Sequence, residues 1–146
     1  MCIVWADGWK RSNLKVVDFA AEFLRETVAF GELIAAADPD APVPTCPEWN
    51  VTQLFRHVGG GIRWAAQIVI DRAEGPIDPR EVPGARAPKG MAAALDWLRA
   101  GAVTLTQAAA EAGETPVWTF TGPKPASWWV RRRLHETVVH RADAAI

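Results

Sequence analysis

Apolar residues recur at helical spacing in four stretches of the chain, and segments rich in proline and glycine separate these stretches. Spacings of three, four and seven residues predict helices over about 14–37, 51–72, 90–112 and 126–144. No alternating pattern of useful length for a strand and no internal repeat is present. The pattern therefore predicts an all-α four-helix bundle over residues 14–146, preceded by an N-terminal extension over residues 1–13.

The second predicted helix has a clear start and a clear core face. Asn50 is the expected N-cap, with Gln53 three residues later in the capping-box position. His57 falls on the flank of the core stripe. The run Gly59-Gly60-Gly61 follows shortly after it. Each glycine costs about 1 kcal/mol relative to alanine inside a helix, so the run needs a reason. Close helix packing and room for a ligand both remain open. The core stripe is predicted to contain Leu54, Phe55, Val58, Ile62, Ala65, Ile68 and Val69.

The fourth predicted helix carries two stripes. Its apolar side is predicted to contain Trp128, Leu134, Val138, Val139 and Ala142, with His135 among them. A polar stripe contains Arg132, Glu136, His140 and Asp143. One interpretation of this stripe is an exposed face with an Arg132–Glu136 ion pair worth only about 0.2–0.5 kcal/mol. The other makes Glu136 and His140 metal ligands, supported by Asp143 and Arg132.

Length, charge and cysteine content narrow the class of protein. The chain has 146 residues and a formal net charge of −1, which suits one domain and gives no electrostatic footprint for nucleic acid. Two cysteines without CxxC spacing suit a reducing cytosol. Neither a signal peptide nor a membrane span of about 20 apolar residues is evident. We expect a cytoplasmic protein with no nucleic-acid or membrane partner, and a homodimer is compatible with a bundle of this size.

His57, Glu136 and His140 form the obvious set of metal ligands. Glu136 and His140 are four residues apart and share a helix face, while His57 lies on another helix. Two imidazoles and one carboxylate leave an open position, as in catalytic zinc sites. The zinc-protease motif is excluded, because His135 and His140 are five residues apart and point roughly 140° away from each other. A non-haem iron site lacks its usual ligand spacing, and a bundle without metal also remains open.

Two segments resemble signatures of one protein family. The run from Val43 to Val51 (VPTCPEWNV), followed by Leu54 and His57, resembles the opening signature of mycothiol-dependent maleylpyruvate isomerase-like proteins. The stretch from Gly122 to Trp129 is similar to that family's second signature, which continues through Arg133, His135, Glu136, His140, Arg141 and Asp143. The resemblance covers nearly the whole chain after Asn13. It implies a metal-binding four-helix bundle of the DinB-like superfamily.

The resemblance also implies a chemistry. Family members bind a divalent metal, usually zinc, through positions that match His57, Glu136 and His140. The enzymes use mycothiol, the small thiol of actinobacteria, which in the isomerase adds to the electrophile maleylpyruvate, allows a carbon–carbon bond to rotate and is eliminated. A thiol of pKa about 8.5 is mostly protonated at neutral pH, and metal coordination deprotonates it. From its position on the polar stripe, and not from the resemblance, Arg132 is the predicted catalytic residue, binding a substrate carboxylate.

Two further features bear on the activity. The characterised isomerases carry an additional C-terminal domain, whereas this chain ends at Ile146. Cys46 lies in a loop before a proline without an evident base, so we do not predict it to be a nucleophile. The leading prediction is a mycothiol-dependent isomerase or thiol transferase acting on a small electrophile. The alternative is a non-catalytic bundle that binds a metal or a small molecule.

Overall fold

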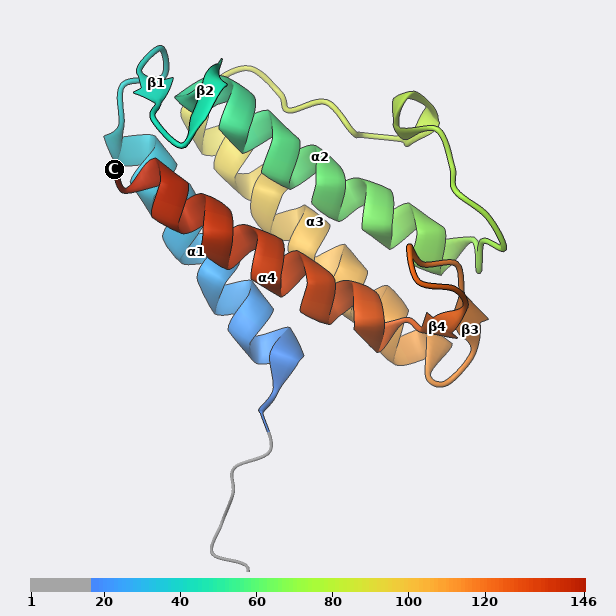
Figure 1. Cartoon of the computed structure of the whole chain (residues 1–146). Coiled ribbons are helices and arrows are strands. Elements are labelled where there is room, and N and C mark those ends of the chain that lie inside the picture. The colour runs from blue at the N-terminus through green and yellow to red at the C-terminus, as the bar shows by residue number, and fades with distance from the viewer. Residues whose placement is uncertain (1–16) are drawn as a thin grey trace, which may run out of the picture.

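Four α-helices form a bundle in the computed structural model, which describes residues 17–146 (Figure 1). The all-α prediction is therefore confirmed, and the predicted extension over 1–13 lies outside the described residues. Within residues 17–146, no helix combines the length and the apolar character needed to cross a membrane. The helices are α1 (Phe19–Ala36), α2 (Val51–Ile70), α3 (Met91–Ala112) and α4 (Ser127–Ala144).

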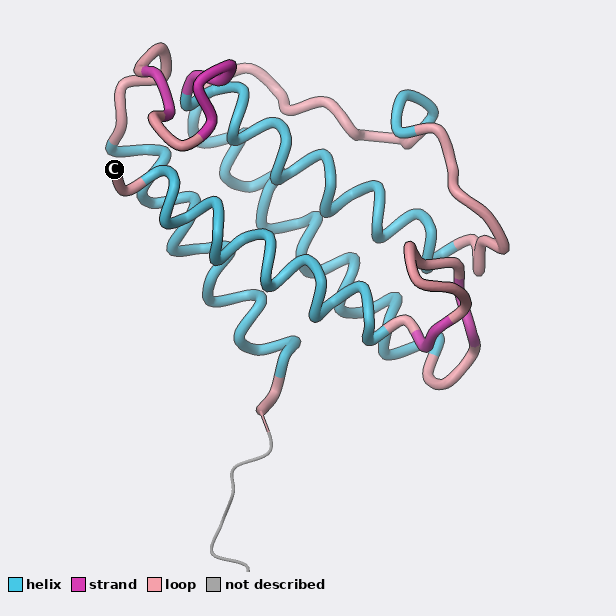
Figure 2. The backbone as a smooth tube through the Cα atoms, viewed as in Figure 1, coloured by secondary structure: helices cyan, strands magenta, loops and turns pink. Residues whose placement is uncertain are grey.

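The helices form two parallel pairs that run in opposite directions. α1 and α4 run one way and α2 and α3 run the other, so the connection over residues 71–90 returns along the bundle (Figure 1). It includes a short 3₁₀ helix, η1 (Pro79–Glu81). α4 packs against both α1 and α2. Two small antiparallel hairpins lie at opposite ends of the bundle (Figure 2): β1 (Pro42–Val43) with β2 (Cys46–Asn50), and β3 (Pro116–Val117) with β4 (Lys124–Pro125).

The helix starts follow from local capping. The predicted capping box of α2 is confirmed, with Asn50 and Gln53 each bonding the other's backbone N–H through its side chain. The first helix begins later than predicted, because the Asp18 side chain accepts a hydrogen bond from the Ala21 amide at 3.1 Å and caps the helix there. The prediction is therefore wrong for residues 17 and 18, and residues 14–16 lie outside the described part.

The core faces agree with the prediction for α2 and differ for α4. All seven residues of the predicted α2 stripe are buried. On α4, the exposed residues include Val138, Val139, Ala142 and His135, so the predicted apolar side is wrong at these positions. The reason is that the inner face of α4 contains two polar residues, Arg133 and Thr137. A search for apolar periodicity does not identify them. The buried residues of α4 are Trp129, Val130, Arg133, Leu134 and Thr137.

Two of the three glycines on α2 are needed for close contacts. A Cβ at Gly59 would lie 2.1 Å from the Trp97 ring of α3, and a Cβ at Gly61 would lie 2.6 Å from Nη1 of Arg133 on α4. A Cβ at Gly60 would meet only a backbone oxygen at 3.6 Å, an ordinary contact. Close packing thus explains Gly59. Gly61 makes room for a charged side chain, one helical turn beyond His57.

Candidate metal centre

α2 and α4 bring together the three side chains predicted to bind a metal. His57, Glu136 and His140 each offer a donor atom, and these atoms lie within 4.8 Å of one another. Glu136 Oε2 is 3.4 Å from His140 Nε2. The two imidazole rings lie perpendicular, with centroids 5.1 Å apart. Residues almost eighty positions apart in the sequence therefore converge in one place, which we term the ligand triad.

The donor chemistry of the ligand triad fits a divalent metal. Ligand atoms about 2.0–2.1 Å from a tetrahedral ion lie about 3.4 Å from each other, which matches the separation of Glu136 and His140. His57 is the exposed member and comes from the facing helix. Its pKa is lowered from 6.5, first by burial of the ring and then by His140, while Glu136 opposes the shift. A lowered pKa favours the neutral imidazole, which is the form that binds metals.

His140 is oriented from behind by Asp143. Asp143 Oδ2 lies 2.9 Å from His140 Nδ1, and Asp143 Oδ1 accepts a hydrogen bond of 2.7 Å from Thr45. Burial alone would raise the pKa of Asp143, but the hydrogen bonds from Thr45 and His140 hold it below its usual value. An ionised carboxylate on Nδ1 leaves Nε2 directed at Glu136. This is the usual arrangement behind a metal-binding histidine.

The β1–β2 hairpin closes one side of the ligand triad. The ring of Trp49 on β2 lies 4.6 Å from that of His57 and 6.2 Å from that of His140, measured between centroids. Cys46 Sγ is 3.8 Å from Asp143 Oδ2, and Cys46, His140 and Asp143 form a second, overlapping group of potential ligands. A hollow of about 330 Å³ beside the hairpin is lined by residues 46–49. Trp49, which contacts both imidazoles, also lines this hollow, whereas none of the ligand triad does.

Two neighbouring arginines on α4 differ in their surroundings. Arg132, the predicted catalytic residue, is 46% exposed, and its Nη2 lies 2.5 Å from Glu136 Oε1. Arg133 is only 8% exposed, and its guanidinium lies over the rings of Trp64 and Trp129. Burial lowers the pKa of Arg133 to about 10, although Glu136 opposes this effect. Arg132 has an anionic partner in Glu136, whereas no carboxylate of the described residues forms an ion pair with Arg133.

Other features of the site were not evident from the sequence. Of the two interpretations of the polar stripe of α4, the exposed face does not hold for Glu136, His140 and Asp143, whose side chains are 24%, 12% and 14% exposed. The contacts of Asp143 with Thr45 and Cys46 span almost one hundred residues, and no local sequence pattern predicts them.

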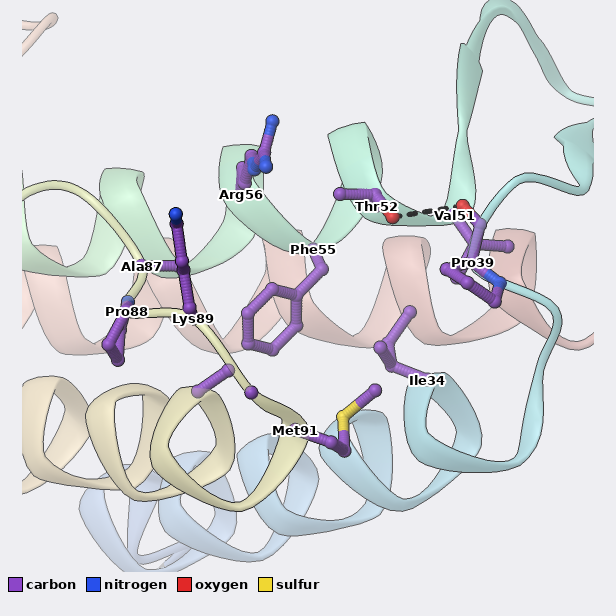
Figure 3. Close-up of a pocket in the computed structure, with 12 residues that line it drawn as sticks. Ile34, Pro39, Val51, Thr52, Phe55, Arg56, Ala87, Pro88, Lys89 and Met91 are labelled. Carbon is purple, nitrogen blue, oxygen red and sulfur yellow. Dashed lines mark hydrogen bonds between the residues drawn. The ribbon is translucent and has the colours of Figure 1, made fainter.

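A separate pocket of about 300 Å³ lies between the starts of α2 and α3, and none of the ligand triad lines it (Figure 3).

Comparison with known families identifies the family of this chain. Residues 20–145 match the family model described as mycothiol maleylpyruvate isomerase N-terminal domain. This family lies in the DinB-like superfamily. The matched region contains all four helices and the complete ligand triad. No curated protein and no solved structure matches the chain.

Proposed function

This chain belongs to the mycothiol maleylpyruvate isomerase N-terminal domain family, and on that premise we propose that it binds a divalent metal ion, zinc by preference, for a mycothiol-dependent isomerisation or thiol transfer. The ligands are His57, Glu136 and His140. The observation that supports this most is the convergence of these three donors from two helices, with Asp143 behind His140. The proposal implies a cytoplasmic protein of an organism that makes mycothiol, the thiol of actinobacteria.

Each supporting residue has a role in this proposal. A bound divalent metal supplies a Lewis acid that lowers the pKa of a coordinated thiol. Asp143 holds the His140 ring with Nε2 toward the centre. Arg132 holds one oxygen of Glu136, which leaves Oε2 on the side of His140. The remaining N–H groups of Arg132 lie at the exposed rim, where they are available for the predicted contact with a substrate carboxylate.

The β1–β2 hairpin and its hollow provide the place for the organic reactants. Trp49 covers the two imidazoles on one side. The hollow along residues 46–49 opens beside this ring. A thiol and a small electrophile that meet here are held next to the ligand triad, which favours addition by proximity.

Metal content of the purified protein tests the proposal. We expect about one zinc ion per chain after reconstitution of the stripped protein. His57→Ala and His140→Ala should each weaken zinc binding by more than about 100-fold, because they remove a ligand rather than its support. His135→Ala is the matched control, since this histidine lies on the exposed side of α4. Failure of the wild-type chain to bind zinc, or unchanged binding in His140→Ala, would contradict the proposal.

A second candidate function keeps the metal site without turnover. In that case the bundle binds a metal or a small molecule and the chemistry lies elsewhere. Incubation of zinc-loaded protein with mycothiol and maleylpyruvate separates the two candidates. Isomerisation or adduct formation that requires both zinc and mycothiol supports the enzyme. Zinc binding without either product supports the binding module.

A further inference from the structure

Arg133 lies buried between α2 and α4 without a partner for its charge. Its side chain is 8% exposed, and Nε is fully buried with no hydrogen-bond acceptor. Within residues 17–146, no carboxylate forms an ion pair with this guanidinium. Buried charges in proteins are normally paired, because removal from water is costly. An unpaired buried arginine therefore requires an explanation.

The neighbouring aromatic rings supply only part of that explanation. The guanidinium carbon lies 5.8 Å from the Trp64 ring centroid and 5.6 Å from the Trp129 ring centroid, within the range of cation–π attraction. Such rings stabilise the charge through their faces. They offer no acceptor in the plane of the guanidinium, where its five N–H groups point. The buried Nε has no acceptor among the described residues.

The position of Arg133 connects it to the ligand triad. On α4 it precedes Glu136 by three residues, so the two side chains share a face. On α2 its Nη1 lies against Gly61, which follows His57 by four residues. Arg133 therefore lies one turn away from the triad on both helices. Any side chain at position 61 would occupy the space of the guanidinium, since a Cβ there would be 2.6 Å from Nη1.

We infer that Arg133 determines specificity by binding a carboxylate of the ligand that occupies the proposed metal centre. The inference rests on the proposed function for the metal and adds a second residue, on the buried side of the site, that contacts a carboxylate, whereas Arg132 lies at the exposed rim. The planar fork of arginine matches a carboxylate with two parallel hydrogen bonds. The preferred ligands then carry an anionic group about one helical turn, or about 5 Å, from the atom that reacts at the ligand triad. Neutral electrophiles of the same size bind more weakly.

The experiment titrates zinc-loaded full chain with succinate and with its neutral analogue succinamide. Zinc affinity is measured first on every variant. We expect the wild-type chain to prefer succinate, and Arg133→Gln to weaken succinate binding by about tenfold or more while succinamide and zinc binding stay unchanged. Arg133→Lys should recover only part of the preference, because it keeps the charge and loses the fork.

A glycine pair provides a test that leaves Arg133 in place. Gly61→Ala should displace the guanidinium and weaken succinate binding by severalfold. Gly60→Ala is the matched control, because its Cβ meets only a backbone oxygen at 3.6 Å. Both changes replace glycine by alanine on neighbouring positions of α2, so a general effect on the helix would appear in both. This pair decides the matter if Arg133→Gln does not fold.

The outcomes separate this inference from the proposed function. Normal zinc binding with equal succinate affinity in wild type, Arg133→Gln and Gly61→Ala would overturn the role of Arg133 and leave the metal centre intact. Absence of zinc binding by the wild-type chain would overturn both. Loss of the preference for succinate over succinamide in Arg133→Gln, at unchanged zinc affinity and unchanged resistance to urea, would establish the carboxylate contact, since a purely structural role would not change that ratio.

Discussion

The interface between α2 and α4 has two ends of opposite character. At one end the ligand triad and Asp143 place polar side chains beside the β1–β2 hairpin. At the other end, beside the β3–β4 hairpin, aromatic rings pack with centroids about 5–6 Å apart, mostly edge to face, an arrangement that favours their quadrupoles. We term this second end the aromatic cluster, which contains Trp64, Trp118, Phe120, Trp128 and Trp129.

The contrast shows that one end of the α2–α4 interface stabilises the fold, while the other end carries the candidate metal ligands. Trp129 is fully buried, and its indole N–H donates a 2.8 Å hydrogen bond to the Trp118 carbonyl. Large apolar contacts of this kind stabilise the bundle. The triad end brings together donor atoms that are better suited to an ion than to one another. Such sites commonly lower stability, and stability elsewhere in the fold compensates for it.

The largest expected effect comes from removing the centre of the aromatic cluster. Trp129→Ala should lower the free energy of unfolding by about 3–5 kcal/mol, because it leaves a cavity and removes the hydrogen bond to Trp118. Urea denaturation measures this change. Val139→Ala on the exposed side of α4 is the control and should change stability by less than about 0.5 kcal/mol. Equal effects of the two changes would refute the assignment of cohesion to this end.

The middle of α2 tests whether packing between the two ends is as tight as the geometry indicates. Gly59→Ala should destabilise the protein by about 1–3 kcal/mol, because the new methyl group would overlap the Trp97 ring. Gly60→Ala should instead stabilise the protein by up to about 1 kcal/mol through helix propensity. Thermal unfolding of both variants gives the comparison. A stabilising effect at both positions would show that α3 yields easily at Trp97.

The triad end should respond in metal affinity rather than in stability. Asp143→Asn should weaken zinc binding by about 10–100-fold, because the group behind His140 loses its charge. Competition with a chromogenic chelator measures the affinity. The free energy of unfolding of the metal-free protein should change by about 1 kcal/mol, because asparagine keeps an oxygen that can accept a neutral hydrogen bond from Thr45. A large loss of stability with unchanged zinc affinity would reverse the roles assigned to the two ends.

The smallest expected effect is a pH dependence at the triad end. The pKa of His57 in the folded protein lies below its ordinary value of 6.5, so the unfolded chain binds the proton more readily. Stability of the metal-free protein is then fully present above about pH 6.5 and falls as the pH drops through the lowered pKa. His57→Gln should remove this part of the acid sensitivity. The urea midpoint of each protein, measured between neutral pH and pH 5, tests this expectation. The same dependence of the midpoint on pH in the wild type and in His57→Gln would contradict the lowered pKa of His57.

The sequence was sufficient to predict the fold, because helix positions depend on local spacing, whereas the proximity of His57 to Glu136 and His140 depends on how α2 packs against α4. Helical periodicity located all four helices, and the four-residue step between Glu136 and His140 placed them on one face. The face of α4 was harder to predict. Val138 and Val139 are exposed, whereas Arg133 is buried, and an arginine beside two others is expected on a solvated surface.

The parts of the site that sequence alone did not reveal depend on tertiary contacts. The hydrogen bond from Thr45 to Asp143 joins the hairpin to the last turns of α4. The packing of Trp49 on His57 depends on the path of β2 into α2. The space for Arg133 arises from Gly61 on another helix. The glycine run of α2 indicates that a neighbouring group lies close to this helix. It does not indicate that the group beside Gly61 is the side chain of Arg133.

The contact of Trp49 with both imidazoles also makes tryptophan fluorescence a reporter of the site. Among the tryptophans in the described residues, Trp49 is the one whose ring lies within 4.6 Å of His57 and 6.2 Å of His140 by centroid distance. A nearby histidine ring quenches indole fluorescence, and more strongly when the ring is protonated. We therefore expect the fluorescence lifetime of Trp49 to change when His57 and His140 bind a metal ion or a proton. The protein therefore carries its own fluorescent probe of occupancy at the ligand triad, with no label required.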